Sequence, residues 1–256
     1  VKIIFQPAEE GVRGAAAVAA SGILDDVDYF LSSHVAMLAK SGELATDPYG
    51  FLCTTKYDVT FHGRASHAGV SPQEGRNALA AAANATVQML GISRHGGGMT
   101  RVNVGQLIAG EGRNVIPSKA VMKLEVRGET MEINNYMCEQ VTNICEGIAK
   151  SFSVTYDISK MGEAVDLTAD RELVDILNES GREVGLKVLD KPLNFGGSED
   201  ATILARRVQS HGGKAAFFVW GSDRPSGHHS ALFDINAKDL DKSLELWTHI
   251  LPKILK

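Results

Sequence analysis

The chain has 256 residues, of which 44% are apolar and 22% charged, so it has room for two modest hydrophobic cores. Its net charge of -5 excludes a nucleic-acid surface, which needs a clustered basic face. No run approaches the roughly 20 apolar residues of a membrane span, and an odd count of three cysteines favours a reducing cytoplasm over a disulfide framework. We therefore expect a small-molecule partner, and neither nucleic acid nor membrane.

The first stretch with chemical character is FQPAEEG, Phe5 to Gly11. It follows an apolar run, Val1 to Phe5, that predicts a buried strand, and it precedes an alanine-rich segment, Gly11 to Ala20, that predicts a helix. Glu9 and Glu10 then lie at the carboxyl end of a strand, where α/β enzymes bind ligands. Adjacent carboxylates raise each other's pKa unless a cation lies beside them, so one acid can ligate a metal while the other removes a proton from water. Alternatively, both acids only complement the macrodipole in the first helical turn.

A second strand is expected at Tyr29 to Ser33, and it ends at His34. Strand, crossover helix and strand form a βαβ unit, which brings His34 to the same edge as Glu9 and Glu10. A single histidine after a strand is more commonly a packing or surface residue. Its place beside two acids favours a metal ligand instead.

A block with a different order of elements begins after Gly50. Alternating apolar residues predict strands and apolar residues at helical spacing predict helices. In chain order the block contains strand Lys56–His62, helix Arg76–Ile92 with Leu79, Ala83, Val87 and Leu90 on one face, strand Arg101–Ile108, strand Lys119–Arg127 with Met122, Leu124 and Val126 inward, a helix through Met137, Val141, Ile144, Cys145 and Ile148, and strand Ser153–Ser159. This order is the ferredoxin-like motif, which predicts an inserted α+β domain.

From about Gly162 onward, helices and strands alternate again. The predicted elements are helix Arg171–Gly185, helix Asp200–Ser210, apolar strand Ala215–Trp220, and helix Lys238–Leu255 with Leu240, Leu244, Trp247 and Leu251 on one stripe. The fold class is therefore α/β with an inserted ferredoxin-like α+β domain. The polar loop before the last helix contains His228 and His229.

Six separated motifs resemble the M20 metallopeptidase and amidohydrolase family, and most closely its aminobenzoyl-glutamate hydrolase branch. The motifs are FQPAEEG, SSHV (32–35), GRASHAG (63–69), GRNVIP (112–117), GGSEDA (196–201) and GHHS (227–230). The resemblance implies a three-layer catalytic α/β domain with a mixed sheet, at residues 1–52 and 164–256, interrupted by a lid and dimerisation domain at 53–163. It also implies two divalent metal ions, Zn or Mn, and hydrolysis of an N-acyl amino acid, with p-aminobenzoyl-glutamate as the expected substrate.

The resemblance also implies roles for single residues in the catalytic domain. Glu9 matches the general base and Glu10 a metal ligand. His34 matches a ligand of the second metal, and His229 matches the last ligand, with His228 as a neighbouring loop residue.

The lid is expected to supply the groups that touch the substrate. His67 matches the histidine that reaches across the dimer to polarise the scissile carbonyl, and Asn114 and Arg127 match the groups that hold the substrate carboxylate. From the residues alone, His67 can equally be a turn residue, and Arg127 a surface charge paired with Glu125 or Glu129.

Two features stand apart from this assignment. Ser198, Glu199 and Asp200 of GGSEDA are expected to cap the helix that follows, with support of the metal site as a second role. The family's CGHD-type motif, which supplies the remaining ligands upstream of the acid pair, is absent, so we expect that an N-terminal part of the catalytic domain is missing from this chain.

The alternatives are another N-acyl amino acid or dipeptide hydrolase of the same family, and a non-catalytic dimerisation module. A homodimer through the lid is expected in each case, and a heteromer with a related subunit is a further alternative.

Overall fold

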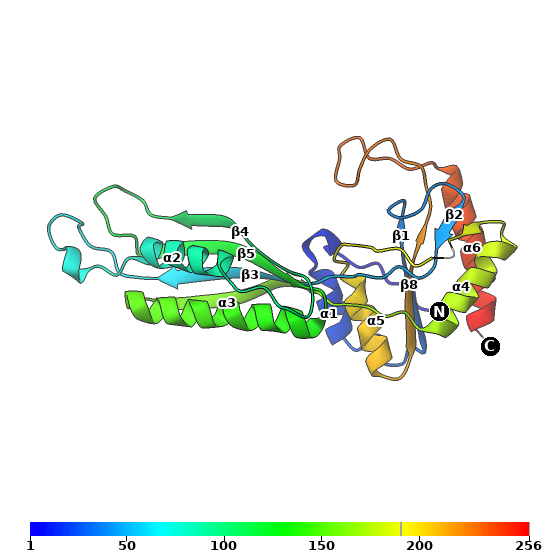
Figure 1. Cartoon of the computed structure of the whole chain (residues 1–256), viewed down its shortest axis with the longest axis horizontal. Helices are drawn as coiled ribbons and strands as arrows, with labels where there is room; N and C mark the ends of the chain where they lie inside the picture. Colours follow the sequence, from blue (N-terminus) through cyan, green and yellow to red (C-terminus); the bar gives the residue numbers. More distant parts are fainter. Residues whose placement is uncertain (190, 256) are drawn as a thin grey trace. The chain divides into compact units, whose positions relative to one another are not determined.

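The computed structural model describes residues 1–189 and 191–255, and its chain divides into two compact units (Figure 1). Unit 1 comprises Val1–Glu9, Gly14–Phe51 and Asp166–Lys256, and unit 2 comprises Glu10–Arg13 and Leu52–Val165. Two residues inside the predicted catalytic domain, at positions 190 and 256, lie outside the described residues. Each unit has a four-stranded sheet of its own.

The sheet of unit 1 has the order β1-β8-β2-β7 and is mixed. β1 (Tyr29–Val35) runs parallel to β8 (Lys214–Trp220), whereas β2 (Glu43–Ala45) runs antiparallel to β8 and parallel to β7 (Lys187–Val188). Residues 215–219 of β8 are all buried, as is typical of a strand covered on both faces. The sequence analysis missed β2 and β7 because strands of three and two residues carry no periodicity.

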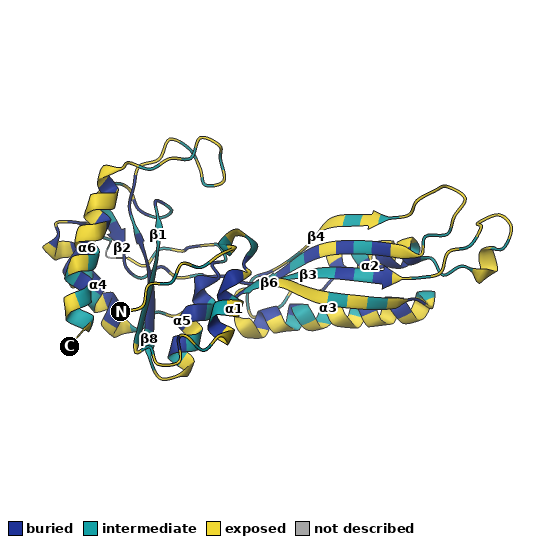
Figure 2. Ribbon diagram, turned by 180° about the vertical axis from the view of Figure 1, so that it is seen from behind, coloured by how far each residue is buried: buried dark blue, intermediate teal, exposed yellow. Residues whose placement is uncertain are grey.

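Helices cover both faces of this sheet and confirm the three-layer arrangement. Because successive residues of a strand point to opposite faces, Phe218 packs with α4 (Arg171–Glu183) and α6 (Lys238–Ile254), whereas Phe217 packs on the side of α5 (Ala201–Ser210). The short helix α1 (Gly14–Ala20) packs on α5 through a cluster of small and branched apolar side chains. Figure 2 shows the buried core of β8 between these helices.

The expected first strand does not form. Val1–Phe5 lies outside every described strand, and Val1, Ile3 and Phe5 are 81%, 76% and 92% exposed. The predicted βαβ unit is therefore wrong in this structure, and β1 is the outer strand of the described sheet, next to β8. An apolar run becomes a strand only where a neighbouring strand satisfies its backbone N–H and C=O groups.

Unit 2 has the ferredoxin-like topology that the order of elements predicts. Its strands are β3 (Cys53–His62), β4 (Thr100–Ala109), β5 (Lys119–Gly128) and β6 (Thr155–Ala164), and its helices are α2 (Ala78–Leu90) and α3 (Met131–Phe152). The sheet order is β4-β5-β3-β6, with every neighbouring pair antiparallel. Met122, Leu124 and Val126 of β5 are buried as predicted, and they form one core with residues of α2 and α3.

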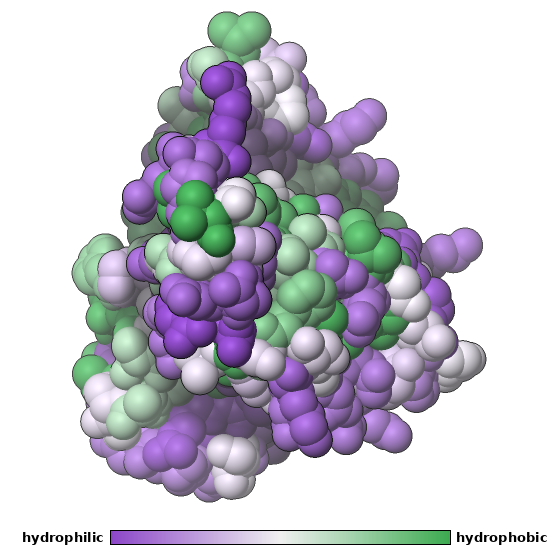
Figure 3. All heavy atoms as spheres, turned by 90° about the vertical axis from the view of Figure 1, so that its left-hand side faces the viewer, coloured by the Kyte–Doolittle hydropathy of each residue, from purple (hydrophilic) through white to green (hydrophobic). Residues whose placement is uncertain are grey.

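Two helices bury a face other than the predicted one. α2 packs through Ala78, Ala81, Ala82, Ala85 and Met89, whereas Val87 and Leu90 of the predicted stripe are 72% and 50% exposed. α6 buries Leu246 and Ile250, whereas Leu240 and Leu244 are 49% and 66% exposed. The alanines of α2 allow a close approach to the sheet, so the bulkier apolar side chains lie outside. Figure 3 shows apolar side chains exposed between hydrophilic ones at the end of unit 2.

None of the described helices combines the length and the apolar character that crossing a membrane requires.

Candidate functional site

An acidic cluster in unit 1 joins the FQPAEEG and GGSEDA motifs. Carboxylate oxygens of Glu9, Glu199 and Asp200 lie within 4.8 Å of one another. Glu199 and Asp200 are buried, with 7% and 0% of their surface exposed, whereas Glu9 reaches solvent. The structure thus brings the predicted general base beside two acids for which the sequence predicts mainly a capping role.

Asp200 does not cap its own helix, contrary to expectation. Its Oδ1 accepts a hydrogen bond from Nε2 of Gln6 at 2.6 Å, and its Oδ2 accepts one from the backbone N–H of Ala15 at 3.3 Å. Glu199 takes over part of the capping, because its Oε1 accepts from the backbone N–H of Ala201 at 3.1 Å. Burial raises the pKa of Asp200, while the hydrogen bonds that its carboxylate accepts act in the opposite direction.

A pair of imidazoles lies at the end of β1. The rings of His34 and His228 are 5.1 Å apart between centroids and meet edge to face. Nδ1 of His34 lies 2.9 Å from the carbonyl oxygen of Val35. In the tautomer that donates Nδ1–H to this carbonyl, Nε2 carries the lone pair that a metal ion needs.

The ring beside His34 belongs to His228, whereas the sequence predicts His229 as the ligand. His229 is exposed and has a φ of 62°, an uncommon value for a residue with a side chain. The ring of His228 also packs on Phe233, at 4.6 Å between centroids. Two adjacent histidines in one loop look alike in sequence, and only the path of the loop distinguishes them.

The segment from Phe195 to Asp200 reaches both groups of side chains. The Phe195 ring lies 6.4 Å from the ring of His34, and Glu199 and Asp200 belong to the acidic cluster. Five residue steps span at most about 18 Å. The imidazole pair and the acidic cluster are therefore parts of one region of unit 1.

Glu10 belongs to unit 2, where the Glu10–Arg13 loop packs on β6. The backbone N–H of Glu163 donates to the carbonyl of Val12 at 2.7 Å. A Cβ added to Gly162 would lie 2.4 Å from the carbonyl oxygen of Gly11, so only glycine fits there. Since the two units are not placed relative to each other, the convergence of Glu10 with His34 and His229 stays a prediction.

His67 and Asn114 lie in two loops of unit 2 that pair with each other. A β-bridge joins His67 to Val115, and the backbone N–H of Ala68 donates to the carbonyl of Asn114 at 2.9 Å. Nδ1 of His67 accepts from the backbone N–H groups of Gly69 and Val70, each at 3.2 Å. In the neutral ring the proton therefore lies on Nε2, which is the arrangement that donates to a carbonyl or oxyanion.

The structure does not bring Asn114 and Arg127 together. Arg127 is half-buried near the end of β5 and forms an ion pair with Glu125 at 3.0 Å, which is the alternative that the sequence leaves open. Asn114 precedes the start of the same strand at Lys119. Eight strand residues at about 3.3 Å each put roughly 26 Å between Lys119 and Arg127. One substrate carboxylate cannot contact Asn114 and Arg127 of the same chain.

Comparison with known proteins identifies the family. The profile of peptidase family M20/M25/M40 matches residues 1–253. The chain belongs to this family.

Relatives of this M20 chain include two hydrolases from bacteria. It is 53% identical over 256 residues to a homolog, in Haemophilus influenzae, of one subunit of p-aminobenzoyl-glutamate hydrolase, a match that covers 100% of this chain and 60% of the relative. It is 42% identical over 238 residues to the indole-3-acetyl-aspartic acid hydrolase of Enterobacter agglomerans, with 92% of this chain and 55% of the relative covered.

A solved structure, the aminobenzoyl-glutamate utilization protein from Klebsiella pneumoniae, matches with a TM-score of 0.84 and 38% identity, over 96% of this chain and 60% of that one. These matches confirm the expected family and the α/β fold. The M20 chain spans about 60% of the length of the Haemophilus relative.

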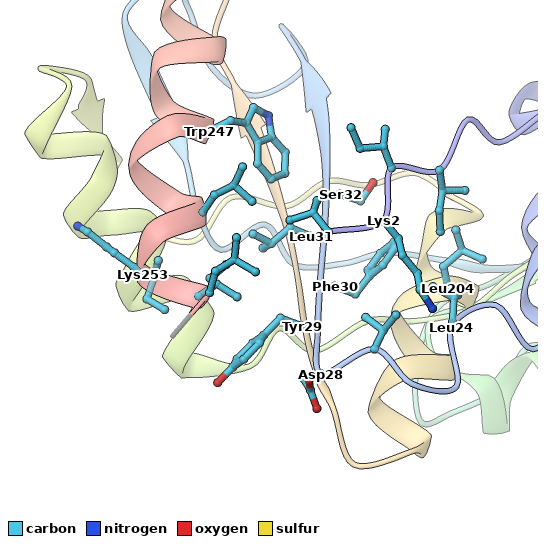
Figure 4. Close-up of a pocket in the computed structure, with 18 of the residues that line it drawn as sticks. Lys2, Leu24, Asp28, Tyr29, Phe30, Leu31, Ser32, Leu204, Trp247 and Lys253 are labelled. Atoms are coloured by element: carbon cyan, nitrogen blue, oxygen red, sulfur yellow. The ribbon is translucent and has the colours of Figure 1, made fainter.

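A large apolar cavity of this M20 chain lies apart from the predicted site residues. It has a volume of about 1730 Å³ and follows the outer edge of β1, between the N-terminal segment and α6 (Figure 4). Leu31, Leu204 and Trp247 are among the residues that line it, whereas none of the residues predicted for catalysis, metal binding or substrate binding does. Its lining suits apolar packing better than hydrolytic chemistry.

Proposed function

We propose that the chain acts in metal-dependent hydrolysis of an amide bond between an aromatic acyl group and an acidic amino acid, with p-aminobenzoyl-glutamate as the leading substrate. The observation that carries this proposal is the pair of imidazoles, His34 and His228, in the same region as the acid cluster around Glu9. The names of the two relatives support the substrate class, because p-aminobenzoyl-glutamate and indole-3-acetyl-aspartic acid both join an aromatic acyl group to an acidic amino acid.

The donor set suits divalent metals of the kind the family is expected to bind, two ions of Zn or Mn. Imidazole nitrogens, from rings 5.1 Å apart between centroids, and carboxylate oxygens are ligands that both metals accept. We assign His34 and His228 as ligands, in place of the His229 that the motif indicates, and keep Glu10 as the carboxylate ligand. The bound metals would supply Lewis-acid activation of the substrate carbonyl and of water.

The protein's own groups divide the remaining work. Glu9 reaches solvent and takes the proton from the attacking water, and it then returns this proton to the nitrogen of the leaving amino acid. His67, neutral and protonated on Nε2, donates a hydrogen bond to the developing oxyanion. Asn114, in the loop paired with that of His67, binds the carboxylate of the amino acid. Arg127 is kept as a separate carboxylate-binding candidate, which must exchange its partner Glu125 for the substrate.

The test compares His228→Ala with the neighbouring variant His229→Ala. The metal-stripped protein is titrated with Mn²⁺ or Zn²⁺ by calorimetry, and release of p-aminobenzoate is followed. We expect His228→Ala to weaken metal binding by more than about tenfold, as loss of a ligand should, and to abolish hydrolysis, while His229→Ala stays close to wild type. The opposite pattern would return the ligand role to His229.

The same assay separates the rival functions. Faster turnover of N-acetyl amino acids or dipeptides than of p-aminobenzoyl-glutamate would favour another hydrolase of the family. Full metal loading without hydrolysis of any of these substrates would favour a non-catalytic dimerisation module.

We also propose a homodimer through unit 2 and a cytoplasmic location. β4 is the outer strand of its sheet, with Ile108 59% exposed, and α2 exposes Val87 and Leu90. An open strand edge beside exposed apolar side chains is a suitable surface for pairing with a second copy. The Haemophilus relative is named as a homolog of one subunit of its hydrolase, which supports the alternative of a heteromer with a related chain.

A further inference from the structure

We infer that Asp200 is a positioning residue that holds the acid-bearing segment Gln6–Ala15 at both of its ends. One carboxylate oxygen binds the side-chain amide of Gln6, before the acids, and the other binds the backbone N–H of Ala15, after them. Glu9 and Glu10 lie between these two anchors. The inference rests on the proposed function of Glu9 as general base.

The backbone of this segment needs such an anchor. Ala8 and Val12 have φ values of 59° and 50°, which place both in the left-handed region. For residues with a side chain this region costs on the order of 1 kcal/mol or more, and a β-branched residue such as Val12 is a clear outlier there. A conformation that is unfavourable for the chain itself persists only when its surroundings hold it.

The turn also folds back closely on itself. A Cβ added to Gly14 would lie 1.8 Å from the carbonyl oxygen of Pro7, so the entry and exit of the turn are in contact. Asp200 lies against the same two ends and is completely buried, with 0% of its surface exposed. Water cannot readily replace its hydrogen bonds, so their loss should loosen the turn.

Both oxygens of Asp200 are engaged in these bonds, which distinguishes its role from that of a metal ligand. Its distance to Glu9 is nevertheless short, because their oxygens belong to one cluster within 4.8 Å. Asp200 thereby sets the position of the base, while Glu9 itself reaches solvent.

Unit 1 contains a matched control. Asp170 precedes α4 as Asp200 precedes α5, and its Oδ2 accepts from Nε2 of Gln209 at 2.8 Å and from the backbone N–H of Ala215 at 2.8 Å. It thus makes the same two kinds of hydrogen bond without contacting the segment that bears the acids.

The experiment compares Asp200→Asn with Asp170→Asn in the purified protein. An asparagine at position 200 turns an NH₂ group toward one of the two donors, so one anchor is lost while the shape is kept. We expect amide hydrogen exchange in Gln6–Ala15 to accelerate at least tenfold in Asp200→Asn, and kcat for p-aminobenzoyl-glutamate to fall by about 10–100-fold with KM nearly unchanged. Asp170→Asn should leave both at the wild-type level, even at an equal loss of melting temperature.

Two outcomes would overturn the inference: unchanged exchange of the Gln6–Ala15 segment in Asp200→Asn, or an equal fall in kcat in both variants. If Asp200→Asn does not fold, Gln6→Ala removes the other partner of one anchor and should accelerate exchange in the same segment. Absence of hydrolysis in the wild-type protein would contradict the proposed function, whereas the exchange measurement would still decide the role of Asp200.

Discussion

Cys145 lies on the buried face of α3, and burial raises the pKa of its thiol to about 12. Only the thiolate is nucleophilic, so we expect iodoacetamide at pH 8 to label Cys145 in the native protein far more slowly than the partly exposed Cys138. Peptide mass spectrometry of the alkylated protein measures both rates. Equal labelling of the two cysteines would show that the packing of α3 on the sheet is not as described.

The raised pKa of Cys145 also predicts a direction for stability at high pH. The thiol titrates near its ordinary value of 9.0 when unfolded and near 12 when folded, so between these values the unfolded chain binds fewer protons than the folded one. This group therefore lowers the free energy of unfolding as pH rises from about 9 toward 12. Cys145→Ala should weaken that slope in urea titrations.

α6 offers a test of which helix face carries the core. Ile250 is 0% exposed and packs in the cluster of α4 and β8, whereas Leu244 on the predicted stripe is 66% exposed. Ile250→Ala should lower the free energy of unfolding by about 2–5 kcal/mol, and Leu244→Ala by less than about 1 kcal/mol. Urea denaturation followed by circular dichroism measures both, and a larger loss in Leu244→Ala would restore the predicted face.

The assembly state is a property of the whole molecule. Val87 is 72% exposed on α2 of unit 2, and Leu240 is 49% exposed on α6 of unit 1. If a lid dimer forms, Val87→Glu should bury a charge at the interface and yield a monomer at micromolar concentration, because an unpaired buried charge is costly. Leu240→Glu should remain dimeric. Light scattering distinguishes these cases, and a monomeric wild-type protein would contradict the proposed dimer.

The site shows where prediction from sequence reached its limit. The motifs correctly placed His34 at the end of a strand, because an apolar strand followed by a histidine is a local pattern. They could not choose between His228 and His229, which differ only in where the loop turns. They also assigned Asp200 to its own helix, because a capping motif is local, whereas its actual donors lie 185 and 194 residues away.

The sequence by itself determined the elements and topology of unit 2, because alternating and helical periodicities record which side chains face a core, as Met122, Leu124 and Val126 do. Tertiary structure alone decided whether Val1–Phe5 is a strand and which faces α2 and α6 bury. These outcomes depend on the presence of a neighbouring strand and on how closely alanine faces allow two elements to approach. Periodicity along one segment contains no information about the surface against which that segment packs.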